Sequence, residues 1–191
     1  MDLVKEREHL RSAYIPELVF RDYDIRGLAD SEINPQFARS LGHALGNLIG
    51  SADPAPLASS LPEHRFQHSV YVGRDARLSS MGLAAALKEG LVACGCNVID
   101  LGEITTPALN FAVHHGNQSG NGIMVTASHN PATYNGFKII LQHQVISGET
   151  LQQLIPMMRA DKSHSGQPAE GAGSQIEADI VSQYLDHIVN I

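Results

Sequence analysis

Stretches of helical periodicity alternate with short runs of β-type residues through most of the chain, and this alternation constrains the fold more than any other feature. Asn34 opens a stretch whose apolar residues recur at helical spacing as far as Gly50. A second helix is expected to begin at Ser80 and end by Gly95, and a third to span 106–116. The runs of strand composition are 70–72, 97–101, 123–125 and 137–141. The pattern predicts a three-layer α/β/α domain with a mostly parallel mixed sheet covered by helices on both faces.

The 191 residues are expected to form one domain over 1–160, a linker-like segment over 161–174 and a final helix over 175–191. Ser174 and Glu177 have the spacing of a capping box for that helix.

Two further segments depart from the regular alternation of helices and strands. Residues 51–68, rich in Pro, Ala and Ser, are expected to be a connecting loop. A helical pattern around Leu151 and Met158 contains Pro156, which lacks a backbone donor, so a helix there is expected to be kinked or short.

Charge and composition exclude several classes of function. Thirteen Lys and Arg against twenty Asp and Glu give a net charge of -7, which argues against nucleic-acid binding. No apolar run reaches the ~18 to 20 residues that cross a bilayer, and the start, MDLVKEREHLRSAYIPE, lacks a signal-peptide core. We therefore expect a soluble cytoplasmic protein without a membrane partner. Cys94 and Cys96, one residue apart, are expected to be buried free thiols.

The stretch GIMVTASHNPATYNGFKI, residues 122–139, runs from a strand directly into the polar residues Ser128, His129 and Asn130. Ligands of open parallel sheets bind beyond the carboxyl ends of the strands, so this cluster has the position of a site. A serine beside a histidine suggests an acyl hydrolase, but neighbours in extended chain face opposite ways and the Gly-x-Ser-x-Gly elbow is absent. Phosphoryl transfer fits better, because a phosphorylated serine needs nearby cations such as His129 and Lys138. A simple polar turn is the alternative.

Two charge-dense stretches, RDYDIRG at 21–27 and VGRDARLSS at 72–80, are interpreted as strand-to-loop transitions. Arginine suits phosphate because its planar fork donates two parallel hydrogen bonds, and a helix N-terminus at Ser80 could add backbone dipoles. For either stretch alone, a surface cluster of salt bridges is the alternative.

Four stretches in this order, RDYDIRG at 21–27, VGRDARLSS at 72–80, TTPAL at 105–109 and GIMVTASHNPATYNGFKI at 122–139, resemble the first domain of the α-D-phosphohexomutases. The resemblance is greatest to the bacterial phosphomannomutase/phosphoglucomutase branch. The resemblance runs from Pro16 to Leu141. It implies reversible transfer between the 1- and 6-positions of a hexose phosphate, of mannose or glucose. A phosphoserine donates its phosphoryl group, and a bound 1,6-bisphosphate then turns around and returns the other one. The resemblance also implies Mg²⁺ and a hexose 1,6-bisphosphate activator.

By position in the motif, Ser128 is the phosphoserine, and its phosphate would be one ligand of Mg²⁺. His129 and Asn130 would shape its loop. Lys138 is similar in position to the family lysine proposed as general base or as electrostatic partner. Because an ordinary lysine is protonated at neutral pH, the base role needs desolvation or another cation nearby.

The remaining site residues come from the two charge-dense stretches. Tyr23 and Arg26 match the residues that approach the substrate in the family. Arg74 and Asp75 would brace the phosphoserine loop.

The resemblance covers one domain of a four-domain family. The chain lacks an Asp-Gly-Asp-type metal loop, a Gly-Glu-x-Ser-Gly-His sugar loop and an Arg-x-Ser-Asn phosphate loop. It is therefore expected to be an isolated first domain, inactive by itself, with the downstream domains as partners. A phosphoglucosamine mutase domain and a stand-alone phosphosugar-binding module are the alternatives. Ile180, Tyr184 and Ile188 on the last helix are expected to lack a partner and to promote self-association.

Overall fold

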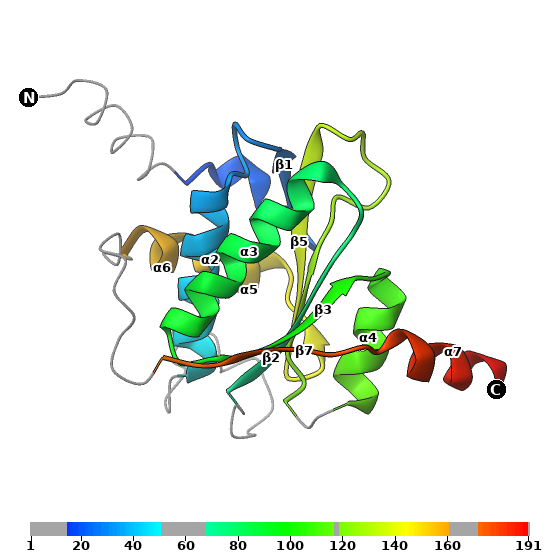
Figure 1. The fold of residues 1–191 in the computed structure, drawn as a ribbon. Coiled ribbons are helices and arrows are strands. Elements are labelled where there is room, and N and C mark those ends of the chain that lie inside the picture. The colour runs from blue at the N-terminus through cyan, green and yellow to red at the C-terminus, as the bar shows by residue number, and fades with distance from the viewer. Residues whose placement is uncertain (1–14, 51–67, 117–118, 161–171, 191) are drawn as a thin grey trace, which may run out of the picture.

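The computed structural model describes residues 15–50, 68–116, 119–160 and 172–190. Its elements, shown in Figure 1, follow in chain order: η1 (Glu17–Val19), β1 (Ile25–Leu28), α2 (Pro35–Gly50), β2 (Ser69–Arg74), α3 (Leu78–Ala93), β3 (Asn97–Glu103), α4 (Thr106–His115), β4 (Gly122–Val125), β5 (Tyr134–Leu141), β6 (Gln144–Val145), α5 (Gly148–Gln152), α6 (Leu154–Ala160), β7 (Gln175–Glu177) and α7 (Val181–Val189).

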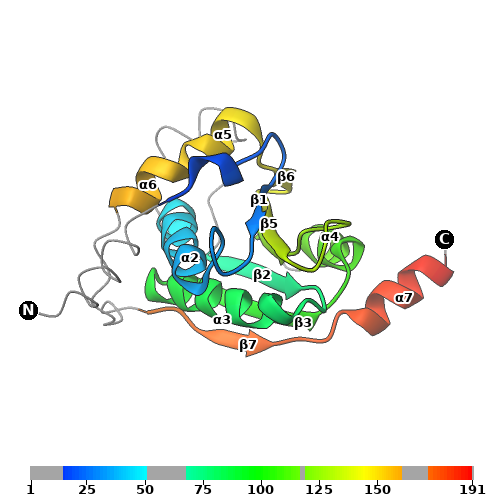
Figure 2. The same ribbon diagram turned by 90° about the horizontal axis from the view of Figure 1, so that it is seen from above.

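A seven-stranded mixed sheet forms the middle layer, in the order β1-β5-β4-β2-β3-β7 with β6 paired to β5. The strands β4, β2, β3 and β7 are parallel, whereas β5 is antiparallel to β1, β4 and β6. Helices α2, α3, α5 and α6 pack on one face and α4 on the other (Figure 2), and each face has its own apolar cluster. The α/β/α architecture with a mixed sheet is confirmed, although its antiparallel part is larger than the sequence indicated.

Helices α2 and α3 cross with their backbones in contact. A Cβ atom built on Gly42 would lie 2.3 Å from the carbonyl oxygen of Leu87, and one on Gly90 would lie 2.3 Å from that of Arg39. Only glycine fits at this crossing, because any side chain would collide with backbone.

The ends of two predicted helices are confirmed. Asn34 Oδ1 accepts a 2.8 Å hydrogen bond from the Phe37 N–H, which caps α2. The side chain of Thr105 caps α4, Pro107 lies in its first turn, and the helix ends before Gly116. Capping is a local interaction, so these ends could be predicted from sequence.

Helix α3 begins at Leu78, two residues before the predicted Ser80. Arg77 directly precedes the helix, and its N–H donates to Asp75 Oδ1 at 3.1 Å. Ser80 is buried in the first turn, where its hydroxyl donates to Asp75 at 2.5 Å.

The helical pattern around Pro156 is divided into α5 and α6, as the predicted interruption required. Pro156 is the third residue of α6, where a backbone N–H would have no partner within the helix. The proline is therefore tolerated because the helix starts just before it.

The prediction of one helix over 175–191 is wrong. Gln175–Glu177 form β7, which pairs with β3, and α7 begins only at Val181. Ser174 does not cap a helix, because its N–H and hydroxyl both donate to Asn97 Oδ1.

The stretch 21–27 also differs from expectation. It was expected to follow a strand, but it leads into β1.

The loop prediction for 51–68 and the linker prediction for 161–174 fall mostly on 51–67 and 161–171, outside the described residues. None of the helices in the described ranges combines the length and the hydropathy of a bilayer-spanning segment.

Both cysteines are free thiols, with Cys96 buried and Cys94 half-buried. Burial raises the pKa of the Cys96 thiol to about 12, with a smaller contribution from the neighbouring Cys94.

Candidate active site

The polar loop follows β4, a fully buried strand between β5 and β2. Ala127 is buried, but Ser128 and His129 are exposed at the tip of the loop. Ser128 has a φ of 58°, in the left-handed region that few non-glycine residues adopt. Its N–H donates to Thr126 Oγ1 at 2.9 Å. The backbone therefore presents the serine hydroxyl outward, past the carboxyl end of the strand, and such strain is typical of functional loops.

Arg77, at the start of α3, holds this loop. Its guanidinium donates to four backbone carbonyl oxygens: those of Ser128 (3.0 Å), Asn130 (2.7 Å), Pro131 (2.7 Å) and Tyr134 (3.1 Å). The Arg77 side chain is only 14% exposed. One side chain thus fixes the path of the loop on both sides of His129.

Asp75 joins Arg77 to the base of the loop. Its carboxylate accepts from Arg77 Nε at 3.0 Å and from Thr126 Oγ1 at 2.7 Å. Burial acts to raise the pKa of Asp75, but the hydrogen bonds from Ser80 and Thr126 outweigh it and hold that pKa below its ordinary value. Asp75 is therefore an ionised support of the loop.

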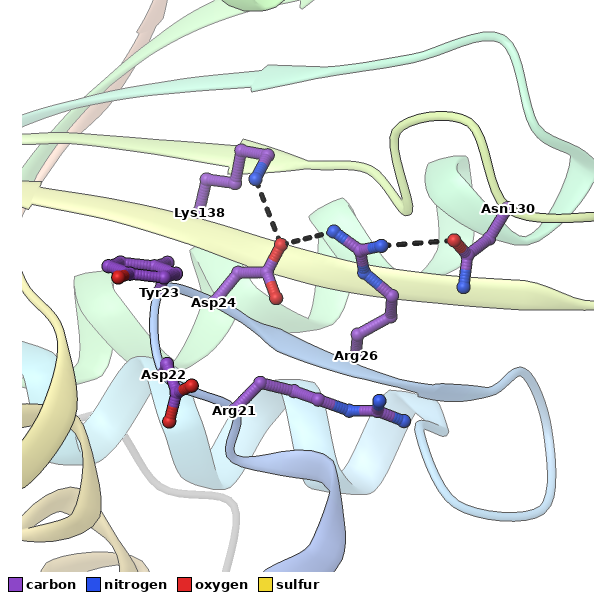
Figure 3. Close-up of a pocket in the computed structure, with 7 residues that line it drawn as sticks. All are labelled: Arg21, Asp22, Tyr23, Asp24, Arg26, Asn130 and Lys138. Atoms are coloured by element: carbon purple, nitrogen blue, oxygen red, sulfur yellow. Dashed lines mark hydrogen bonds and ion pairs between the residues drawn. The ribbon is translucent and has the colours of Figure 1, made fainter.

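A cavity of about 420 Å³ lies beside the loop (Figure 3). It is lined by Arg21, Asp22, Tyr23, Asp24, Arg26, Asn130 and Lys138. These side chains come from the segment before β1, from β1 itself, from the loop and from β5. The antiparallel pairing of β1 with β5 brings the distant segments together.

Within this cavity, a single carboxylate oxygen joins two cations. Asp24 Oδ2 accepts from Lys138 Nζ at 2.9 Å and from Arg26 Nη2 at 2.5 Å. Arg26 Nη1 in turn donates to Asn130 Oδ1 at 3.0 Å. Burial favours a raised pKa for Asp24, but hydrogen bonds from Lys138 and Arg26 outweigh it and lower that pKa.

The family model for "Phosphoglucomutase/phosphomannomutase, alpha/beta/alpha domain I" matches residues 17–164. The chain belongs to the phosphoglucomutase/phosphomannomutase family. The resemblance predicted from the motifs is thereby confirmed.

Relatives within the phosphoglucomutase/phosphomannomutase family agree in the extent of the match. A phosphomannomutase/phosphoglucomutase of Pseudomonas putida is 37% identical over 181 residues, which cover 95% of this chain and 35% of the relative. A phosphoglucomutase of Neisseria gonorrhoeae is 34% identical over 177 residues, 93% of this chain and 35% of the relative. The chain spans about 35% of the length of these curated relatives.

A solved structure of a phosphoglucomutase/phosphomannomutase family protein from Burkholderia thailandensis superimposes with a TM-score of 0.75 at 33% identity. The match covers 93% of this chain and 36% of that chain. A phosphoglucomutase from Paramecium, 15% identical with a TM-score of 0.59, shares the fold.

The residues expected from the family motif are divided between loop tip and cavity. Lys138 and Arg26 are joined through Asp24, and Arg26 also donates to Asn130. Tyr23, 73% exposed, lines the same cavity. Ser128 and His129 were expected to face opposite ways, but Ser128 Oγ lies 3.4 Å from His129 Nδ1. The left-handed backbone of Ser128 turns the two side chains together.

Arg74 does not contact the loop as expected of a brace. Its guanidinium pairs with Glu103 at 3.0 Å and donates to the carbonyl oxygen of Asp75. Arg77 makes the loop contacts instead, because it follows the end of β2 and turns toward β4, whereas Arg74 points to β3.

Sequence reasoning missed Arg77 and Asp24 as site residues. Asp24 and Arg26 are two residues apart, and Asp75 and Arg77 have the same spacing, which could have predicted both ion pairs. No local signal predicts the contacts that Arg77 makes with the loop of Ser128.

Among the described residues, no group of three or more His, Cys, Asp or Glu side chains could hold a metal ion. The described part of the chain therefore does not supply the set of carboxylates that a Mg²⁺ site uses.

Proposed function

We propose that this chain is the phosphoserine-bearing first domain of a phosphomannomutase/phosphoglucomutase, with Ser128 as the phosphoryl carrier. The observation that carries the proposal is the exposed Ser128 hydroxyl, held in a left-handed turn by Arg77 beside a cavity that contains Lys138 and Arg26. A fixed nucleophile next to cations is what phosphoryl transfer requires, because this chemistry depends on positioning and on charge. The substrates would be the 1- and 6-phosphates of mannose or glucose.

In the first step, the bond between phosphorus and Ser128 Oγ breaks while a bond forms from phosphorus to a free hydroxyl of the sugar phosphate. The hydroxyl loses its proton, which ends on Ser128 Oγ. His129 Nδ1, 3.4 Å from that oxygen, is placed to hold the proton in transit. The 1,6-bisphosphate then turns around, and the reverse step returns its other phosphoryl group to Ser128. Lys138, Arg26 and Tyr23 would contact the sugar phosphate from the cavity.

We propose no step through Mg²⁺, because the described residues offer no set of ligands beyond a phosphate on Ser128. Without such ligands, this chain alone is expected to be inactive, and hexose 1,6-bisphosphate would activate only a longer enzyme. We also propose that this activity belongs to the cytoplasm.

The test is intact mass and peptide mapping after incubation with glucose 1,6-bisphosphate and Mg²⁺. It compares the chain alone with a chimera in which the chain is joined to the remaining domains of the Pseudomonas putida relative. We expect one phosphoryl group on Ser128 in the chimera, none in the chimera with Ser128→Ala, and none in the chain alone. A chimera that interconverts hexose phosphates but carries its phosphate elsewhere would overturn the assignment of Ser128.

A further inference from the structure

Asp24 is the buried centre of a network that spans the cavity. Its side chain is 8% exposed, and its Oδ2 atom accepts hydrogen bonds from both Lys138 Nζ and Arg26 Nη2 (Figure 3). Lys138 lies 114 residues away along the chain, on β5, so the contact depends on the pairing of β1 with β5. The positively charged Lys138 ammonium and Arg26 guanidinium therefore lie close together. The Asp24 carboxylate between them makes this arrangement favourable.

The network also reaches the loop of Ser128. Arg26 is held on one side by Asp24 and on the other by Asn130, two residues after Ser128. Arg26 Nε is buried and has no hydrogen-bond partner among the described residues, so the two Nη atoms alone orient the guanidinium. Displacement of Asp24 would release both Lys138 and Arg26.

We propose that Asp24 is a positioning residue, which holds the Lys138 ammonium and the Arg26 guanidinium at one point of the cavity. An ammonium held at this point attracts phosphoryl oxygens, so Lys138 acts as an electrostatic partner of the transferred group. The inference rests on the proposed function for the identity of the ligand, a sugar phosphate, whereas the contacts of Asp24 stand without it.

The other charged groups of the cavity provide the control. The charged or titratable groups that line it with Lys138 are Arg21, Asp22, Tyr23, Asp24 and Arg26. Asp22 is exposed and lies apart from the Asp24 carboxylate in Figure 3. Asp22→Asn therefore removes the same charge from the same cavity without removing a contact to Lys138.

The experiment measures the rate at which an amine-reactive ester labels Lys138, as a function of pH, by peptide mass spectrometry. Only neutral amines react, so the pH profile reports how firmly the Asp24 carboxylate holds the Lys138 ammonium. Lys88, which pairs with Asp100 in another part of the fold, is the internal reference. Thermal unfolding of each variant shows whether it is folded.

We expect Asp24→Asn to raise the labelling of Lys138 relative to Lys88 by roughly three- to tenfold at pH 8 and to move the profile to lower pH, because Arg26 then repels the ammonium. Asp22→Asn should leave the profile near that of the unaltered chain. Arg26→Gln should slow the labelling of Lys138, since the Asp24 carboxylate then pairs with this lysine alone. If Asp24→Asn does not fold, this variant tests the proposal in its place.

An unchanged profile in Asp24→Asn, or an equal change in Asp22→Asn, would overturn the proposal, as would faster labelling in Arg26→Gln. These outcomes are independent of whether Ser128 accepts phosphate. Failure of the proposed function would appear in the mass of Ser128 peptides, and failure of this inference would appear only at Lys138.

Discussion

Arg77 Nη2 donates a 3.0 Å hydrogen bond to the carbonyl oxygen of Ser128, 51 residues further along the chain. The same guanidinium donates hydrogen bonds to three other carbonyl oxygens of the loop and to one carboxylate oxygen of Asp75. The conformation that exposes the Ser128 hydroxyl is thus imposed from outside the loop.

Replacement of Arg77 by methionine is expected to lower the free energy of unfolding by about 2–3 kcal/mol, because several half-buried carbonyl groups lose a charged donor. Urea unfolding gives this value, and amide hydrogen exchange should become faster over 127–134. Arg74→Met is the matched control. Arg74 pairs with Glu103, which is 56% exposed, so its loss should cost less than ~1 kcal/mol. Equal effects of the two variants would contradict the role given to Arg77.

Asp75→Asn is expected to change how stability depends on pH. The folded chain holds the pKa of Asp75 below 3.8, so the unfolded chain takes up the proton first as pH falls. The contribution of Asp75 is therefore complete above its ordinary pKa and is lost as pH falls through the lower folded value. Urea unfolding between pH 7 and pH 2 should show a shallower loss of stability at acid pH in Asp75→Asn. A slope identical to that of the unaltered chain would mean that the carboxylate is not preferentially ionised in the fold.

Gly42→Ala should destabilise the chain by about 2 kcal/mol or more, because the new methyl group would meet the carbonyl oxygen of Leu87 at the crossing of α2 and α3. Gly82→Ala is the control within α3. A Cβ atom there meets nothing within 4 Å, so the substitution should stabilise by roughly 0.5–1 kcal/mol through helix propensity. Thermal unfolding distinguishes the two, and a tolerated Gly42→Ala would show that the helices can separate at little cost.

Helix α7 is expected to promote self-association of the chain. The sequence pointed to Ile180, Tyr184 and Ile188, but Ile180 is buried and Tyr184 packs against the apolar cluster of α4. The apolar side chains that α7 exposes are Val181, Leu185, Ile188 and Val189. Such a surface favours association.

Light scattering over a range of concentrations tests this expectation. Leu185→Glu should lower the apparent mass, and Gln183→Glu, which adds the same charge at an exposed polar position, should not. A chain that stays monomeric at high concentration would contradict the prediction.

The sequence by itself determined the features that depend on neighbours along the chain. The cap at Asn34, the proline in the first turn of α4 and the break before Pro156 each involve residues within one helical turn, so their physics is contained in a short window. The polar loop after β4 was also visible, because a buried apolar run must end where such residues begin.

Tertiary structure decided which distant segments meet. Gln175–Glu177 have little strand character of their own and become β7 only because β3 offers an unpaired edge. Arg74 and Arg77 are indistinguishable by composition, and only the turn from β2 into α3 aims one at Glu103 and the other at Ser128. The contact of Asp24 with Lys138 likewise requires the pairing of β1 and β5. Such contacts depend on how the whole sheet is ordered, because the free energy of a charged pair is set by the burial and the partners that the complete fold provides.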